Sequence, residues 1–272
     1  GTLNAVNSVG IVNLDGGTFA AKQIIKGGAA ASGTLNFNGG TLKANAAATA
    51  ATFLQGMSAA NVRDGGAIID TNAQDITIAQ LIQHSVIDGD AAVDGGLTKN
   101  GAGKLTLSAS NTYTGDTTVS AGTLSLAAAA LADTSDVIIA SGATLDLTHA
   151  STDIVDSLTI NGVAMANGVY GAIGSGAQFE NAAITGSGKL QVGTNPYDSW
   201  ATSKGLTGGD ALSSADPDND GMVNLMEFFL DGSPTSFTSA PAASAVGSNL
   251  SINFKRRDDA EANVASQFVD RK

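Results

Sequence analysis

The chain has 272 residues, a formal net charge of −12, no cysteine and only two histidines. A chain this acidic lacks the basic surface that a nucleic-acid binder needs to neutralise phosphates. The absence of cysteine excludes disulfides, thiolate metal sites and cysteine catalysis, and two histidines argue against a zinc site. An apolar fraction of 43% is too high for a disordered chain, so we expect a folded protein whose core is made of small aliphatic side chains.

The two ends of the sequence are unusual for a complete protein. It begins at Gly1 without a methionine or a charged and apolar leader, and it ends at Lys272 just after a strand-like stretch. We therefore expect a section of a longer protein. No run of eighteen apolar residues occurs, so the sequence predicts no transmembrane helix.

The prolines divide the sequence. All four of them follow residue 195, at Pro196, Pro217, Pro234 and Pro241. Because proline removes a donor from a β-ladder, the stretch before them can form an uninterrupted ladder. We predict three parts, namely a β-solenoid at 1–193, a calcium-binding module at 194–235, and at 236–272 the start of a C-terminal β domain or strands that exchange with another chain.

A short phrase recurs through the first part. It is a glycine followed by threonine, alanine or lysine and then by alternating apolar and polar residues, which predicts strands with one buried face. It begins at Gly1, Gly17, Gly33, Gly40, Gly122, Gly142 and Gly188. The step from Gly17 to Gly40 is 23 residues and that from Gly122 to Gly142 is 20. Repeats of this length are typical of solenoids, and they predict roughly nine coils.

The central block carries a resemblance to a known family. Residues 97–107 read L-T-K-N-G-A-G-K-L-T-L, residues 111–119 read N-T-Y-T-G-D-T-T-V and residues 121–124 read A-G-T-L. This segment resembles the autotransporter-associated β-strand repeat of passenger-type β-helix proteins. The resemblance implies an all-β fold, a right-handed parallel β-helix, export from a bacterium and a stalk or display role without catalysis. We expect the solenoid to be followed by a small helical calcium-loop module and a truncated β segment.

Residues 216–227 form the strongest chemical motif. They read D-P-D-N-D-G-M-V-N-L-M-E and fit the EF-hand loop D-x-[DN]-x-[DN]-G-x₅-E at every specified position. The motif predicts one Ca²⁺ bound by three aspartates, a backbone carbonyl, an asparagine acting directly or through water, and a bidentate glutamate. These ligands would be Asp216, Asp218, Asp220, Met222, Asn224 and Glu227. The alternative is an acidic, solvated turn.

The flanks of this loop predict two short helices. Residues 224–230 would form a short helix with Leu225, Phe228 and Phe229 as its apolar face, and residues 197–204 would form a partner helix with Trp200 as its core anchor. The arrangement resembles a dockerin-like or thrombospondin-type-3-like module with one calcium ion, which would stiffen a joint. Further on, residues 249–255 alternate as a strand, and a second strand is expected around residues 264–269.

The other reactive residues are expected to have structural or solvated positions and no catalytic role. The acids Asp70, Asp75, Asp88, Asp90 and Asp94 are expected to be solvated turn residues, and Lys99 and Lys104 to lie at the surface or at corners. His84 and His149 have no patterned partners, and Tyr113 and Tyr170 are expected to pack at corners. No hydrolase or nucleotide-binding fingerprint occurs, so we expect no enzyme.

Three functions are consistent with these features. The leading hypothesis is a non-enzymatic secreted or cell-surface structural protein, a stalk or display passenger rigidified by calcium. The second is a self-assembling subunit of an extracellular filament or surface layer, joined through the solenoid ends or the C-terminal strands. The third is a carbohydrate-binding or carbohydrate-active β-helix. The partners then expected are further copies of the chain, surface glycans or cell-surface proteins, and no nucleic acid.

Overall fold

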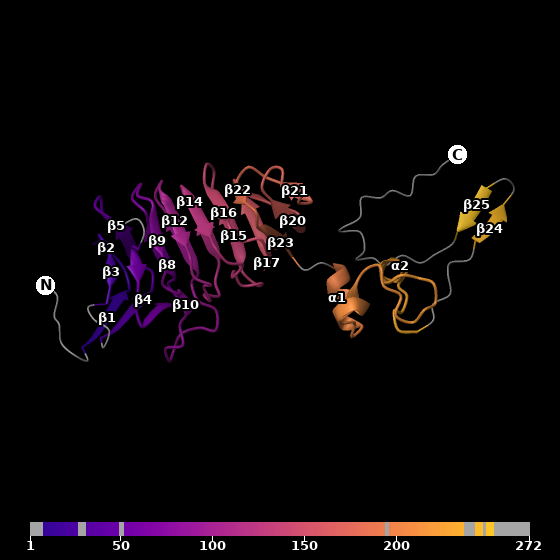
Figure 1. Ribbon diagram of the computed structural model, residues 1–272, viewed down its shortest axis with the longest axis horizontal. Coiled ribbons are helices and arrows are strands. Elements are labelled where there is room, and N and C mark those ends of the chain that lie inside the picture. Colours follow the sequence, from indigo (N-terminus) through magenta and orange to yellow (C-terminus); the bar gives the residue numbers. More distant parts are fainter. Residues whose placement is uncertain are drawn as a thin grey trace. The chain divides into compact units, whose positions relative to one another are not determined.

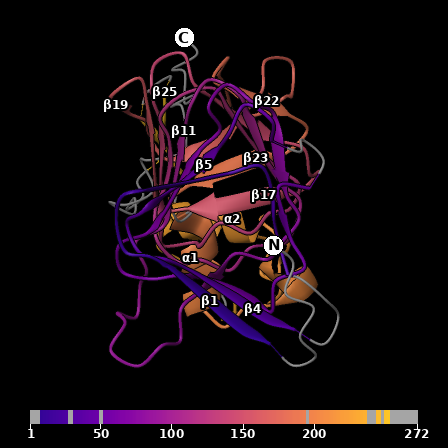
Figure 2. The same cartoon turned by 90° about the vertical axis from the view of Figure 1, so that its left-hand side faces the viewer.

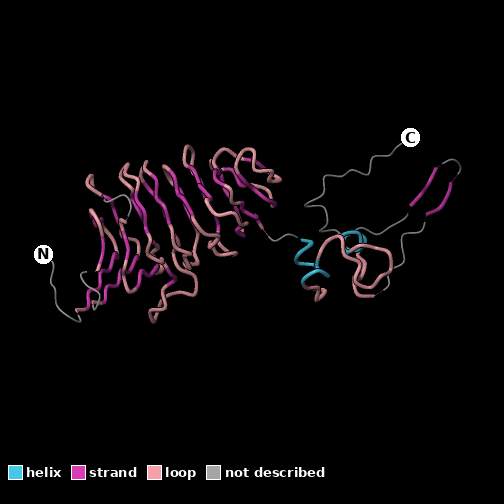
Figure 3. Tube along the Cα trace, viewed as in Figure 1, coloured by secondary structure: helices cyan, strands magenta, loops and turns pink. Residues whose placement is uncertain are grey.

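The computed structural model describes residues 8–26, 31–48, 52–193, 196–236, 243–246 and 249–252. The chain divides into two compact units, Gly1–Gly193 and Thr194–Lys272. Strands fill the first unit and helices occur in the second (Figure 3). Each unit is considered by itself.

The first unit is a β-solenoid in which successive strands of the chain join different sheets (Figure 1). The first sheet holds β1 (Val9–Leu14), β4 (Ser32–Phe37), β7 (Ala59–Val62) and β10 (Gln83–His84). The second sheet runs from β2 (Thr18–Ala21) through β5 (Thr41–Ala44), β8 (Ala67–Asp70), β11 (Leu97–Asn100), β13 (Thr117–Val119), β15 (Asp136–Ile139) and β18 (Ser157–Ile160) to β19 (Val163–Ala164).

Two more sheets complete the solenoid. The third holds β3 (Ile24–Ile25), β6 (Leu54–Gln55), β9 (Ile76–Ile78), β12 (Lys104–Leu107), β14 (Thr123–Leu126), β16 (Thr144–Leu147) and β22 (Ile184–Gly186). The fourth holds β17 (Thr152–Val155), β23 (Lys189–Val192), β20 (Gly168–Gly171) and β21 (Phe179–Glu180). Strands one coil apart pair in parallel, as between β12 and β14, which confirms the predicted β-solenoid.

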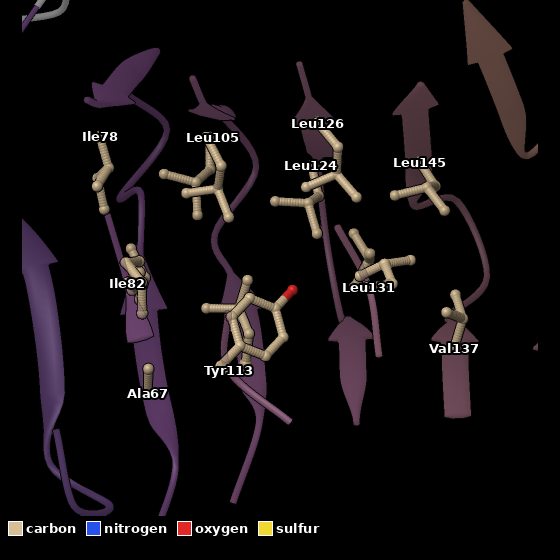
Figure 4. Packing of buried hydrophobic residues seen from close by; sticks show 14 of the residues in the cluster. Ala67, Ile78, Ile82, Leu105, Tyr113, Leu124, Leu126, Leu131, Val137 and Leu145 are labelled. Atoms are coloured by element: carbon tan, nitrogen blue, oxygen red, sulfur yellow. The ribbon is translucent and has the colours of Figure 1, made fainter. Parts of the chain in front are cut away.

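The core lies inside the coils. Along each strand, alternate residues point inward, and the same position of successive coils stacks in register. In the third sheet one interior row runs through Ile76, Leu105, Leu124, Leu145 and Ile184, all buried. Figure 4 shows members of this row beside Ile82, Tyr113 and Leu131, so the solenoid is a filled core and not a channel.

The number of coils differs from the predicted nine. Seven strands of the second sheet, β2 to β18, stack in parallel among the described residues. The step between partners is 20 residues from Leu97 to Thr117 but 30 from Ala67 to Leu97. Several coils therefore carry loops that the shortest repeats of the sequence do not contain.

Antiparallel strands end the stacking. Strand β19 pairs antiparallel with β18, and β20 pairs antiparallel with β23. The ring of Tyr170 in β20 stacks on Phe179 in β21 with centroids 4.9 Å apart, and the Tyr170 hydroxyl donates to the Ala166 carbonyl over 2.9 Å. These strands cover the last coil, in which Leu158 and Leu190 are fully buried.

The second unit contains α1 (Pro196–Ser203), a 3-10 turn (Gly208–Ala211) and α2 (Asn224–Leu230). Both helices were predicted, and Trp200 is their buried anchor; the ring of Tyr197 is tilted against it, and the ring of Phe228 meets it edge to face. The predicted apolar face of α2 is wrong for Leu225, which is 39% exposed, whereas Phe229 packs against the core.

Beyond the helices, β24 (Ala243–Val246) and β25 (Asn249–Ile252) form an antiparallel hairpin. The strand predicted at 249–255 is thus present over its first residues. Its partner is residues 243–246 and not the expected second strand, which lies outside the described residues.

Candidate metal centre

Three carboxylates converge in the loop before α2. Asp216, Asp218 and Asp220 each place an oxygen within 4.8 Å of the others. No other group of three acidic, histidine or cysteine side chains comes together in this way in the part of the chain that the structure describes. The convergence of like charges raises the free energy of the loop unless a cation lies between them.

The backbone of the loop wraps around these carboxylates. Asp216 accepts hydrogen bonds from the amides of Asp220, at 3.2 Å, and Gly221, at 3.0 Å. Asp220 accepts one from the Met222 amide at 2.8 Å. Gly221 has a φ of 89°, a conformation that favours glycine, so the sharp turn at this position depends on the residue that the motif specifies.

Asn224 is fully buried at the start of α2. Its amide nitrogen donates to the carbonyl oxygens of Asp210, at 2.7 Å, and Leu212, at 2.9 Å. Two carbonyl acceptors fix the orientation of the amide group, because its oxygen cannot face them. Its Oδ1 is buried and accepts no hydrogen bond from any described residue. Asn224 therefore ties the loop to the segment around the 3-10 turn and leaves its oxygen available as a ligand.

Glu227 is also fully buried, in the first turn of α2. It lies outside the group of three converging carboxylates, so only three of the four predicted acids come together. Met222, within the loop, is buried, and its predicted contribution is a backbone carbonyl. Oδ2 of Asp218 is, like the oxygen of Asn224, buried without a hydrogen-bond donor. An all-oxygen set with unsatisfied oxygens fits a hard cation such as Ca²⁺.

Lys99 is a polar centre that the sequence interpretation missed. The side chain was expected at the surface or a corner, but it is 0% exposed. Its Nζ donates to the carbonyl oxygens of Gly101 at 2.7 Å, Ala121 at 2.9 Å and Asn100 at 3.1 Å, and lies 3.3 Å from the hydroxyl of Thr71. Burial lowers the pKa of this amine to about 8, although Asp70 and Asp75 counteract the shift.

The alternation of the repeat contains the signal for this burial. Lys99 has the same parity as Leu97 and stacks between Ile69 and Val119 in an interior row. Lys104, in contrast, lies on the outer face as expected, where its Nζ pairs with Asp146 at 2.8 Å.

The acids near residues 70–94 brace turns. Asp94 was expected to be solvated but is buried, and it accepts hydrogen bonds from the amides of Gly96, Thr114 and Gly115. His84 Nδ1 lies 3.0 Å from Oδ2 of Asp94. The Arg63 guanidinium pairs with Asp90 at 2.7 Å and holds the pKa of that carboxyl below its usual value.

The remaining acids, His149 and the two tyrosines occupy positions in the structure that show no sign of a catalytic or binding role. Asp70 pairs with Lys43 at 3.0 Å, and Asp75 and Asp88 are exposed. His149 is nearly buried, and neither ring nitrogen has a hydrogen-bond partner in the described part of the chain. Tyr113 and Tyr170, expected to pack at corners, are buried in the core of the solenoid. None of these side chains forms a second convergent site with the others.

Comparison with known proteins supports the resemblance over one segment. Residues 97–126 match the family model described as passenger-associated-transport-repeat. This is a repeat of autotransporter passengers, and it points to a surface-exposed or secreted bacterial structural protein rather than to an enzyme family. Neither the curated proteins nor the solved structures gave a match. Within the described residues, no helix is both long enough and apolar enough to cross a bilayer.

Proposed function

We propose that this chain is a non-enzymatic structural segment of a secreted or cell-surface bacterial protein, a stalk or display passenger whose second unit binds one Ca²⁺. The observation that carries the proposal is the stacked parallel core, which contains the matched repeat at 97–126 within a regular row of coils. Stacked coils give length and resistance to proteases, because each coil is secured by both neighbours. The acids are used to brace turns, which favours this function over carbohydrate chemistry.

The calcium part of the proposal is supported by the converging aspartates. Asp216, Asp218 and Asp220 would supply carboxylate oxygens, with Met222, Asn224 and Glu227 completing the set. When bound, the ion neutralises these charges and links the loop to α2. Because α2 supplies Phe228 to the core of the unit, ordering of the loop would be transmitted to the packing around Trp200.

Calcium titration of the full chain tests this site directly. By isothermal calorimetry we expect one Ca²⁺ per chain, and we expect Asp218→Asn to weaken binding at least tenfold because it removes a charged ligand. Asp88→Asn is the matched control, since it makes the same chemical change at an exposed acid in the first unit. No binding at millimolar Ca²⁺, or equal losses in the two variants, would disprove the site.

Limited proteolysis tests the stalk. Trypsin can cleave at basic residues throughout the chain, including Arg63, Lys99 and Lys104 inside the solenoid. We expect these bonds to resist cleavage in the native protein, so that one large fragment survives and spans all three. Early cleavage after Arg63 or Lys99 would mean that the coils do not form a protected rod.

A further inference from the structure

The two ends of the solenoid differ in how well their core is covered. Val12 and Phe19 lie in interior rows of the first coil and are 38% and 42% exposed. Their partners in the next coil, Leu35 and Leu42, are completely buried. At the other end, antiparallel β19 and β20 cover the last coil. One flank of the first coil's core is therefore open, and the corresponding flank of the last coil is not.

Among the described residues, the outer edge of the backbone at this end has no partner strand either. Strands β1, β2 and β3 are each the terminal strand of their sheet, and all three belong to the first coil. Figure 2 looks onto this end, with β1 and β4 along its lower side. Edge strands present rows of N–H and C=O groups that another strand can pair with.

A ladder of side-chain amides leads to the same end. Asn36 donates to Asn13 at 2.7 Å, Asn61 donates to Asn36 at 2.8 Å, and Gln83 donates to Asn61 at 3.1 Å. These residues occupy one register position of β1, β4, β7 and β10. The amide nitrogen of Asn13 has no hydrogen-bond partner among the described residues. The ladder thus ends on a group that one more carboxamide would satisfy.

We propose that the first coil is a stacking face for a further parallel β-solenoid coil that carries an asparagine or glutamine in register with Asn13. Three edge strands in one coil favour strands as partners, because strands alone continue all three hydrogen-bonded ladders. The uncovered interior rows require aliphatic or aromatic side chains opposite Val12 and Phe19. The end of the amide ladder requires the carboxamide.

A second copy of this chain does not supply such a coil in the parallel orientation. Its far end is covered by antiparallel β19 and β20, so head-to-tail stacking of two copies would first have to displace them. Charge does not oppose the contact with another acidic solenoid, because the first coil is locally neutral. Residues 9–25 contain one acid, Asp15, and one base, Lys22, in a chain of net charge −12. The inference rests on the solenoid alone and not on the proposed calcium site.

The test supplies the coil within the full chain. A second copy of residues 9–31 is inserted directly before Val9, which reproduces the 23-residue spacing of the β1–β4 and β2–β5 pairs. The copied asparagine then lies opposite Asn13. We expect amide hydrogen exchange in the original β1 and β2, measured by mass spectrometry in EDTA, to slow at least tenfold. Unchanged exchange would overturn the proposal.

Two controls sharpen the result. In the first, the inserted copy carries Asn13→Leu, and we expect it to protect β1 severalfold less than the asparagine copy. Equal protection would overturn the requirement for a carboxamide. In the second, the chain without an insert is examined by light scattering and hydrogen exchange. A stable dimer, or β1 and β2 amides that already exchange slowly, would show that the face has another occupant and would overturn the proposal.

Discussion

At the scale of single residues, Lys99 shows how one charged side chain can join several coils. Its amine contacts Thr71 of the preceding coil, carbonyls of its own coil and the Ala121 carbonyl of the next coil. A lysine is almost never fully buried unless its charge is compensated. Here three carbonyl dipoles replace water around the ammonium group, so the residue acts as a clamp across three coils.

Removing this amine should destabilise the solenoid. In Lys99→Met the aliphatic stem is kept, but the carbonyls of Gly101 and Ala121 lose the donor that reaches them. We expect the free energy of unfolding, measured by urea titration, to fall by about 2–4 kcal/mol. Lys104→Met is the matched control, because that amine is half-exposed and its ion pair contributes at most about 1 kcal/mol. Equal losses would argue against the clamp.

The same residue predicts a dependence on pH. Its pKa is about 8 in the folded chain, below the ordinary value of 10.5, because burial disfavours the charged amine. Between these two values the unfolded chain binds more protons than the folded one, so stability rises with pH. We therefore expect wild type to gain stability relative to Lys99→Met from pH 8 to pH 10. A difference that stays constant or narrows over this interval would contradict the lowered pKa.

The residue scale also shows where sequence interpretation succeeds and fails. A Ca²⁺ loop at 216–227 could be predicted because its motif is confined to twelve consecutive positions, and three of the predicted ligands, Asp216, Asp218 and Asp220, lie close together. Lys99 departs from the usual preference of lysine for the surface, whereas the alternation of the repeat correctly places it in an interior row. The hydrogen bonds from Asn224 to the carbonyls of Asp210 and Leu212 could not be predicted from the neighbouring sequence, because they depend on how the 3-10 turn packs.

At the scale of elements, the corners between strands depend on glycines that stack at close range. Gly96 has a φ of 69°, and a Cβ there would overlap the backbone of Asp116 in the next coil. Asp94 braces the same corner by accepting the Gly96 amide at 2.9 Å. The corner thus combines a left-handed conformation that favours glycine with a contact that leaves no room for a side chain.

Substitution at this corner should therefore be costly. We expect Gly96→Ala to lower the free energy of unfolding by about 2 kcal/mol or more, from strain and from displacement of the neighbouring coil. Gly16→Ala is a matched control, because its φ is not positive and nothing lies within 4 Å of the added carbon. Urea titration of both variants measures the difference. A loss no greater than that of the control would mean that the coils separate at little cost.

Individual strands were easier to predict than the number of coils. Alternation identified the strands because each has one buried and one outer face, as in residues 104–107. The loops between strands have no such period. Residues 85–96, for example, are held by the Arg63–Asp90 pair and by hydrogen bonds to Asp94, contacts made across coils. Counting coils from the shortest repeats consequently gave too many.

At the scale of the whole molecule, the two units have separate hydrophobic cores that share no residue. One extends through the solenoid from Leu14 to Val192, and the other is built around Trp200 and Phe228. Trp200 is the only tryptophan of the chain, so its fluorescence reports on the second unit alone. The strands of the first unit dominate the far-ultraviolet circular dichroism. Two spectroscopic signals can thus follow the two units independently.

Removal of calcium should consequently affect one signal and not the other. The repulsion among Asp216, Asp218 and Asp220 acts on the loop that leads into α2, and α2 contributes Phe228 to the core of the second unit. An ion bound only to the folded unit stabilises it by mass action, by about 2.7 kcal/mol at a concentration one hundred times its Kd. We expect EDTA to lower the thermal midpoint of the tryptophan signal by several degrees and to leave the β-sheet signal unchanged.

Phe228→Ala should lower the same midpoint with calcium present, because it opens the core directly. If EDTA shifted both signals together, the two units would unfold as one, and calcium would stabilise the entire molecule instead of one module.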